Sequence, residues 1–213
     1  FYKMALDADR RNKEGIAPVK PLLAELAAAQ TKADLQKLQI KYAALGLGVD
    51  YGSYFAADEK NVTMNIFNVL QGGLTLGAKD YYLNNDAATV AIREAYKKYI
   101  AQMFQLYGFS AADAQKKAEK VFLHETNLAL ISKSRTELRD PQANYNKMTL
   151  KEFKENYPNI PLEALANAEG IKSEYIQQMV VGQPAFLAGY DKISAAENAE
   201  TLKALMEWGV ICN

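Results

Sequence analysis

Apolar residues recur every three or four positions along most of this chain, which is the period of an amphipathic α-helix. In residues 87–107 the pattern predicts a buried face with charged residues opposite, formed by Ile92, Ala95, Tyr96, Tyr99, Met103 and Leu106. The same period predicts further helices in these stretches: residues 1–14, a helix opened by Pro18 and Pro21, residues 31–45, residues 110–135, residues 149–157, residues 161–170 and residues 194–208.

Helix starts are marked by a hydroxyl residue followed three positions later by a carboxylate, which is the form of a capping box. The pattern occurs four times, at Thr31–Asp34, Ser110–Asp113, Thr149–Glu152 and Ser194–Glu197. Asn85 or Asp86 is expected to cap the helix over residues 87–107. These signals indicate where five of the predicted helices begin.

Two stretches are rich in aromatic and β-branched residues instead. Residues 47–70 contain Val49, Tyr54 and Phe55 and then Ile66, with a hairpin expected across residues 58–61. Residues 172–189 are also expected to be extended. The fold class predicted from these patterns is mainly α with a small β component, organised as one domain over residues 1–213.

Composition excludes several classes of function. Lys and Arg total 25 and Asp and Glu also total 25, so the formal net charge is zero and no basic face for nucleic acid is expected. No run of apolar residues approaches the roughly 20 that a membrane span needs. Cys212 is the single cysteine, so no intramolecular disulfide can form.

His124 and Glu125 begin the pattern H-E-x-x-H of zinc proteases, but Leu128 stands where the second histidine belongs. The chain has only this one histidine, so a zinc site of that type is excluded. Catalysis of the Ser-His-Asp type would also need His124, which has no partner at catalytic spacing. We interpret His124 as a structural residue in an apolar part of its helix, and a small hydrolase built on His124 and Glu125 remains an alternative.

The glycines at positions 72, 73 and 77 suggest a phosphate loop at first sight. Neither G-x-G-x-x-G nor a G-K-[ST] ending is present, so nucleotide binding is not expected. We predict a turn that lets Tyr81 and Tyr82 pack beneath it.

A denser set of motifs lies between residues 125 and 150. Glu125 is followed by Leu128 and Ala129, and the sequence then reads R-T-E-L-R-D-P at residues 135–141 and Y-N-K-M-T-L at residues 145–150. Arg139 beside Asp140 at a turn suggests a catalytic pair, but we favour a structural role, because most charged turns are braced or solvated. A brace would be a fork from Arg139 to Asp140 or Glu137. This run resembles the non-catalytic helical half of the neprilysin-type zinc metallopeptidases, which include endothelin-converting enzymes and bacterial oligopeptidases.

Two further stretches are similar to the same family. Residues 72–82 read G-G-L-T-L-G-A-K-D-Y-Y, with Thr75 and Gly77 where the family commonly has Gly and Pro, and T-L-K-A-L-M-E-W closes the match at Trp208. Phe1, Tyr2 and the residues after them resemble a family segment of the form F-Y-x-S-C-M. In this chain Ala5 stands where that segment has a cysteine. Leu162 replaces a common Trp.

The resemblance implies that residues 1–213 are a fragment of the N-terminal, helical, non-catalytic domain of a larger zinc metalloendopeptidase. It implies that this part is the lid restricting substrate size, and that it contains no catalytic, metal or cofactor-binding residue. The intact enzyme would bind zinc, cleave oligopeptides, and carry its catalytic domain elsewhere in the same chain. The motif residues with an expected structural role are these: Arg135, Arg139, Asp140, Tyr145 and Asn146. Likeness to bacterial members suggests the bacterial cell envelope, and a free-standing helical module that binds peptides or proteins is the alternative function.

Overall fold

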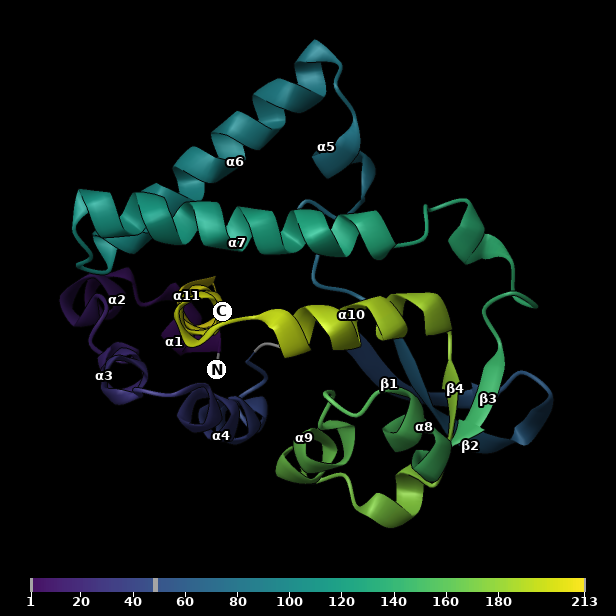
Figure 1. The fold of residues 1–213 in the computed structure, drawn as a ribbon. Helices are drawn as coiled ribbons and strands as arrows, with labels where there is room; N and C mark the ends of the chain where they lie inside the picture. Colours follow the sequence, from purple (N-terminus) through teal and green to yellow (C-terminus); the bar gives the residue numbers. More distant parts are fainter. Residues whose placement is uncertain (1, 48–49, 213) are drawn as a thin grey trace.

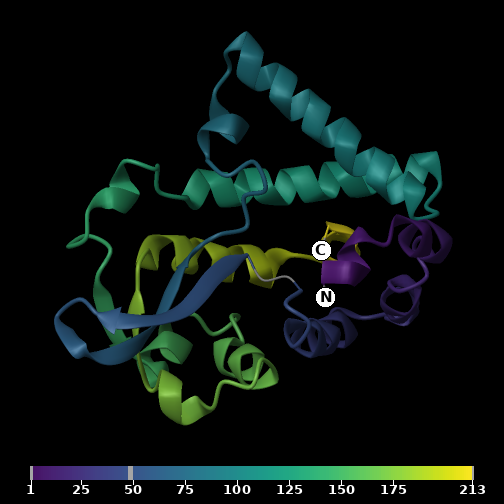
Figure 2. The same cartoon turned by 180° about the vertical axis from the view of Figure 1, so that it is seen from behind.

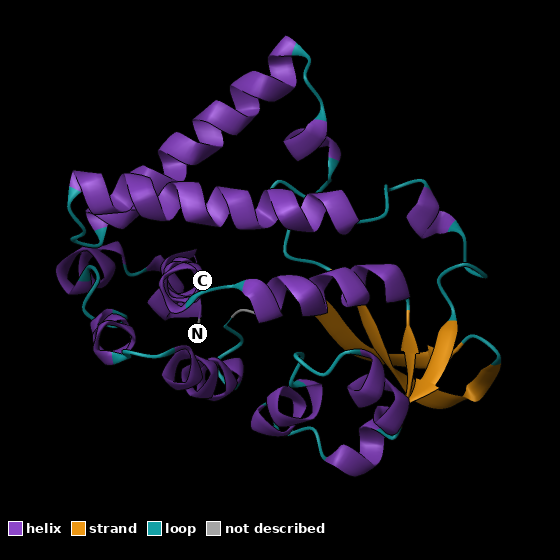
Figure 3. Ribbon diagram, in the orientation of Figure 1, coloured by secondary structure: helices purple, strands orange, loops and turns teal. Residues whose placement is uncertain are grey.

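The computed structural model describes residues 2–47 and 50–212, and within them helices surround one small sheet (Figures 1 and 3). This confirms the predicted fold class, mainly α with a small β component. The expectations for Phe1 and Val49 lie outside the described residues. Figure 3 shows the strands gathered at one end of the molecule, away from the N-terminal helices.

Four helices precede the sheet: α1 (Tyr2–Leu6), α2 (Ala8–Glu14), α3 (Lys20–Ala28) and α4 (Lys32–Ala43). The single helix predicted over residues 1–14 is in fact two, because the side chain of Asp7 accepts a hydrogen bond from the Arg10 amide and begins α2. The capping box at Thr31 is formed as predicted. Gly46, at a φ of 71°, provides the left-handed residue after α4.

The sheet has four strands in the order β1-β2-β4-β3. Strands β1 (Tyr51–Asp58) and β2 (Asn61–Gln71) form the predicted antiparallel hairpin, with Phe55 opposite Phe67. β2 then pairs in parallel with β4 (Gln178–Val181), and β4 pairs antiparallel with β3 (Asn146–Thr149). The parallel pair joins segments more than a hundred residues apart, so the long excursion between them carries most of the remaining helices.

Most of those helices lie between β2 and β4, and two follow β4. Their bounds are α5 (Asp80–Leu83), α6 (Ala87–Leu106), α7 (Ala111–Ile131), the 3₁₀ turn η1 (Glu137–Arg139), α8 (Leu150–Asn156), α9 (Leu162–Ala168), the 3₁₀ turn η2 (Ser173–Ile176), α10 (Pro184–Ala196) and α11 (Ala199–Cys212). In Figures 1 and 2, α7 runs across the molecule from the N-terminal helices towards the sheet end. The C-terminal end of α6 meets the N-terminal end of α7, and the two helices diverge at an angle from there.

α7 joins two of the three apolar cores. Leu128 packs into the core that covers the sheet, whereas Ala118 and Val121 pack with α6 and with Trp208 of α11. A third core forms where α3 and α4 meet Leu202 of α11. α7 and α11 therefore hold the sheet end and the helical end in one arrangement.

Two predictions near the C-terminus were wrong. Residues 172–189 were expected to be extended throughout, but only Gln178–Val181 form a strand, and Pro184 begins α10. Pro is well suited to the first turn of a helix, where it gives up no hydrogen bond. The fourth capping box is absent as well, because Ser194 lies inside α10 and Glu197 ends it. The Thr201 amide instead bonds the side chain of Asn198 at the start of α11.

The buried face of α6 also differs from the prediction. Tyr96 is buried as expected, but Ile100 and Phe104 complete the face, and Tyr99 and Leu106 are exposed by 47% and 71%. Apolar residues occur around much of the circumference of α6, so its sequence is compatible with either buried face. Contact with α7 and Trp208 selects one of them.

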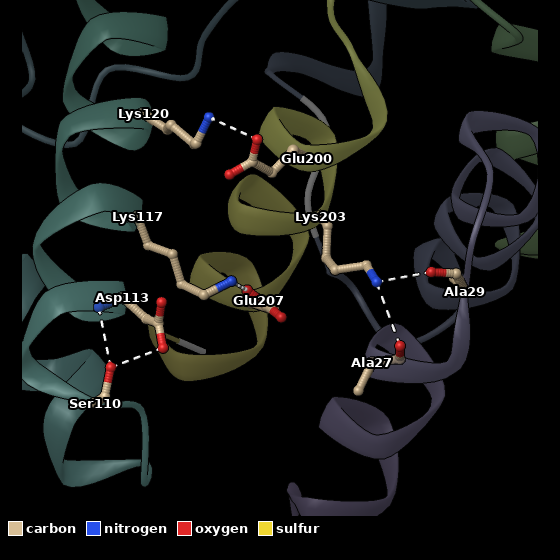
Figure 4. Close-up of polar contacts among 9 residues, drawn as sticks. All are labelled: Ala27, Ala29, Ser110, Asp113, Lys117, Lys120, Glu200, Lys203 and Glu207. Carbon is tan, nitrogen blue, oxygen red and sulfur yellow. Dashed lines mark hydrogen bonds and ion pairs between the residues drawn. The ribbon is translucent and has the colours of Figure 1, made fainter.

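Polar contacts fasten α11 to its neighbours on two sides (Figure 4). Towards α7, Lys117 reaches the buried carboxylate of Glu207, and Lys120 lies 3.5 Å from Glu200. Towards α3, the ammonium of Lys203 donates to the carbonyls of Ala27 and Ala29, at 3.3 and 2.7 Å. A cation there satisfies carbonyls that a helix end leaves unpaired and complements its dipole.

Substitutions of Lys117 and Lys120, two of the lysines of α7, are expected to affect stability differently. Glu207 is 3% exposed and burial raises its pKa, so Lys117→Met would leave a buried carboxylate without its cation. We expect this change to lower the free energy of unfolding by about 2–4 kcal/mol. Lys120→Met, one turn away, is the control, because Glu200 is 73% exposed in that pair and the loss should stay below about 0.5 kcal/mol.

Urea denaturation followed by the fluorescence of Trp208, the only tryptophan, measures both variants. Equal losses in the two variants would contradict the assignment of Lys117–Glu207 as the contact that stabilises α11 against α7.

Candidate functional site

A cavity of about 390 Å³ lies where the sheet end meets the helical end. Its wall is formed by α4, the start of β1, the loop after β2, α7, α9, α10 and α11. Both residues of the H-E pair, His124 and Glu125, line it, as do Asp50, Lys32 and Glu197. The cavity therefore gathers the only histidine of the chain with several charged groups that are distant in sequence.

Both ring nitrogens of His124 face carboxylates. Nε2 lies 2.9 Å from Oδ2 of Asp50, just before β1, and Nδ1 bonds Oε1 of Glu197, at the end of α10. The His124 side chain is only 2% exposed. Because a carboxylate only accepts hydrogen bonds, each ring nitrogen has to donate, and the ring is held as an imidazolium.

The electrostatics agree with this geometry. Burial by itself lowers the pKa of His124, but the charge and hydrogen bond of Asp50, together with those of Glu197, outweigh it and raise the pKa to about 10. At neutral pH this histidine has no free lone pair. It can neither accept a proton from a nucleophile nor bind a metal ion.

The surroundings predicted for His124 were therefore wrong: its contacts are ionic, not apolar. Its carboxylate partners lie 74 and 73 residues away in sequence. No local pattern links either of them to His124, and the sequence pattern had assigned Glu197 to a capping box instead. The contacts of His124 with Asp50 and Glu197 are called the clamp below. They tie α7 to the segment that enters β1 and to the segment that leaves α10.

Glu125 points into a different set of partners, three hydroxyl groups. Its Oε1 accepts from Thr75 at 2.7 Å and from Tyr96 at 2.9 Å, and its Oε2 accepts from Tyr82 at 2.5 Å. Burial raises the pKa of Glu125, and the three hydroxyl donors oppose this shift. Glu125 thus joins α7 to α5, α6 and the loop after β2.

The glycine-rich loop serves this arrangement. Gly73 has a φ of 75°, and a Cβ at this position would lie 2.7 Å from Leu128 and 2.8 Å from Cβ of Asp50. Only glycine fits so close to α7. The Tyr82 hydroxyl also accepts the Leu76 amide at 3.0 Å, so Tyr82 packs beneath the turn as the sequence predicted.

The motif residues from 135 to 146 lie at the other side of the sheet end. Arg135 is exposed beside Gly77, and Asp140 caps the following turn by accepting the amides of Gln142 and Ala143. The Tyr145 hydroxyl donates to Asp58 at 2.7 Å, and the Asn146 amide donates to the Val181 carbonyl at 3.0 Å.

The fork predicted for Arg139 was wrong. Among the described residues no ion pair involves Arg139, which is exposed and lines a hollow of about 360 Å³ on the sheet. Glu137 bonds the amide and hydroxyl of Ser134 instead, at 2.7 and 2.6 Å. Asp140 is engaged by the turn amides. The two acids are satisfied locally, which leaves the guanidinium towards solvent.

Over residues 2–47 and 50–212, no group of three or more His, Cys, Asp or Glu side chains is arranged to hold a metal ion. In the same ranges no helix combines the length and the apolar character that crossing a lipid bilayer would require.

The clamp predicts a specific pH dependence of stability. The pKa of His124 is raised from 6.5 to about 10, so its contribution is fully present below about pH 6.5 and is lost as the pH rises through 10. We expect the free energy of unfolding of the 213-residue chain to fall by a few kcal/mol between pH 6.5 and 9.5, with about 1.4 kcal/mol per pH unit as the limiting slope.

Urea denaturation at several pH values measures this slope, and His124→Gln is the control that removes the titrating group. The difference between the two slopes belongs to His124, because tyrosine and lysine titration is common to both proteins. Equal slopes would show that His124 is not held as an imidazolium.

The chain is similar to a known peptidase family and to several of its members. The N-terminal model of Peptidase family M13 matches residues 1–213. Neprilysin-3 of Drosophila melanogaster is 27% identical over 168 residues, which cover 74% of this chain and 21% of that protein. Endothelin-converting enzyme 1 of Bos taurus is 32% identical over 111 residues, which cover 52% of this chain and 15% of that protein.

A solved structure is similar over nearly the whole chain. The zinc metalloprotease Zmp1 of Mycobacterium tuberculosis, in complex with an inhibitor, matches with a TM-score of 0.87 and 27% identity, over 96% of this chain and 31% of that one. The chain therefore spans about a fifth of the length of its curated relatives and about a third of this structure. Because the family model matches residues 1–213, the whole length of this chain, the chain belongs to Peptidase family M13.

Proposed function

We propose that residues 1–213 form the non-catalytic, helical part of a zinc-dependent metalloendopeptidase that cleaves oligopeptides. In this proposal the chain acts as a lid that restricts the size of substrates, and it supplies no catalytic residue. The observation that carries the proposal is the match of the N-terminal family model to every residue of the chain. The similarity to a solved zinc metalloprotease supports it.

Zinc does not fit the residues of this chain. A catalytic zinc site uses three protein ligands and one open position. The only histidine has both nitrogens committed to Asp50 and Glu197, and Glu125 is held by three hydroxyls. The ion would therefore be held by residues of the same polypeptide outside residues 1–213, and residues 1–213 would take part in no catalytic step.

A size-restricting lid has to keep its shape when substrates press against it. The buried contacts of α7 support such a role, because His124 connects it to the segment before β1 and the end of α10, and Glu125 connects it to α5 and α6. Rigid walls exclude folded proteins by shape alone, whereas short peptides enter without deforming them.

The site geometry also bears on two other functions. A small hydrolase based on His124 is disfavoured by the same clamp, since an imidazolium with both protons engaged cannot serve as a general base. A free-standing module that binds peptides or proteins is favoured by one observation, the cavity of about 390 Å³. Cavities of this size are typical of sites for small ligands, so this one would take only a short part of a peptide.

The proposal predicts where activity resides. The protein expressed from its complete coding sequence should hydrolyse short peptides, lose this activity to a zinc chelator and regain it with added zinc. The 213-residue chain alone should be inactive, because zinc has no ligands in it. Reading the coding sequence for an H-E-x-x-H motif outside residues 1–213 is the first check.

Size restriction is measured by offering one cleavable sequence twice, as a free peptide and inside a folded, stable host protein. We expect kcat/KM to be high for the free peptide and negligible for the folded host. Zinc-independent hydrolysis by the 213-residue chain that disappears in His124→Gln would instead establish the small hydrolase. Tight peptide binding by this chain without any peptidase activity of the complete protein would favour the binding module.

A further inference from the structure

The clamp uses only one oxygen of each of its two carboxylates. Asp50 meets His124 through Oδ2, and Glu197 meets it through Oε1. Within residues 2–47 and 50–212, no group donates a hydrogen bond to Oδ1 of Asp50 or to Oε2 of Glu197. The two acidic side chains line the cavity and are 31% and 14% exposed. Each carboxylate can therefore accept hydrogen bonds from a further donor.

The cationic groups that line the cavity are already engaged. Both ring nitrogens of His124 bond the clamp carboxylates. The ammonium of Lys32 donates to the carbonyls of Ser194 and Ala195, at 2.7 and 2.9 Å, in the last turn of α10. The negative end of the helix dipole lies there and offsets the charge of Lys32. The unused hydrogen-bonding capacity of the charged groups thus belongs mainly to acids, which favours a cationic ligand that donates hydrogen bonds.

Three uncharged polar groups of the lining also lack protein partners. Tyr51 is only 6% exposed, yet its hydroxyl makes no hydrogen bond with any described residue. The side-chain amides of Gln36 and Gln39, on α4, have no hydrogen-bond partner in the same part of the chain. A nearly buried hydroxyl without a partner is unfavourable, so a ligand that provides one is bound more tightly.

Much of the remaining wall is apolar. Leu205 and Met206 of α11 and Ile160, just before α9, line it, and Trp208 adds an aromatic ring. Apolar walls suit the aliphatic stem of a long cationic side chain, and aromatic rings attract its charged end. The lining therefore combines acceptors for a cation with a surface for the stem that carries it.

We propose that this cavity binds the guanidinium or ammonium group of an arginine or lysine side chain in an oligopeptide substrate. The inference rests on the proposed function, because it takes oligopeptides as the substrates and adds the residue class that residues 1–213 recognise. The free oxygens of Asp50 and Glu197 would accept the N–H groups of the cation. A volume of about 390 Å³ is sufficient for one such side chain and its neighbouring backbone.

Equilibrium binding to the protein expressed from its complete coding sequence tests the proposal. A chelator removes zinc, so the probe peptides are not cleaved. The probes are the tripeptides Ala-Arg-Ala and Ala-citrulline-Ala with both ends capped, which have nearly the same shape and differ in charge. By titration calorimetry we expect the arginine peptide to bind about tenfold or more tightly than the citrulline peptide. Equal affinities, or no binding of either peptide, would overturn the proposal.

A charge variant tests which acid is responsible. Glu197→Gln removes one carboxylate but keeps an oxygen to which His124 can donate. We expect it to weaken binding of the arginine peptide about tenfold or more, with little effect on the citrulline peptide. Glu200→Gln is the matched control, because Glu200 is 73% exposed and does not line the cavity. Equal losses in the two variants would show a general effect of net charge and would overturn the site.

A second variant blocks the cavity without changing the clamp. Gly209 lines the cavity on α11, and a Cβ there would meet no described atom outside its own helix within 4 Å. Gly209→Leu would therefore fill empty space, and leucine is the better helix former. We expect the folded variant to lose the preference for arginine over citrulline. An unchanged preference in this variant would overturn the cavity as the site, even if Glu197→Gln fails to fold.

Ethylguanidine, which carries the same cation without a peptide, is the third probe. Binding of ethylguanidine without binding of the arginine peptide would overturn the choice of a peptide as the occupant. None of these measurements depends on zinc or on catalysis. Equal affinities in an active zinc peptidase would overturn the cavity site and leave the proposed function intact. Charge-selective binding by a protein without peptidase activity would do the reverse.

Discussion

The arrangement of this chain depends on how α7 satisfies two adjacent polar residues that it buries. An imidazolium and a carboxylate cannot be moved out of water without partners, because the desolvation of each costs several kcal/mol. His124 receives two carboxylates and Glu125 receives three hydroxyls. These partners come from segments on opposite sides of α7, so satisfying the pair also positions the helices and strands around it.

This requirement explains several features that look unrelated along the chain. The glycine at position 73 allows its loop to approach α7 closely enough for Thr75 to reach Glu125. Lys32 donates to the carbonyls of Ser194 and Ala195 at the end of α10 and so steadies the turn that presents Glu197. Each of these contacts contributes little free energy by itself, but together they hold the partners of His124 and Glu125 in place.

The His-Glu pair illustrates how little a short motif says about chemistry. In a zinc protease the same two residue types act as a metal ligand and a general base, which requires a free lone pair on the imidazole. Here the flanking carboxylates hold both protons on the ring, and the pKa of His124 rises to about 10. The environment converts a potential ligand into a structural cation.

Local chemistry determined much of this protein directly from sequence: the helical class, the caps at Thr31 and Thr149, the β1–β2 hairpin and the family motifs between residues 125 and 150. Only the tertiary structure decided the partners of His124, the start of α10 and the buried face of α6. Capping and periodicity act over three or four residues, so the sequence displays them. Asp50 and Glu197 lie more than seventy residues from His124, and only packing brings such groups together.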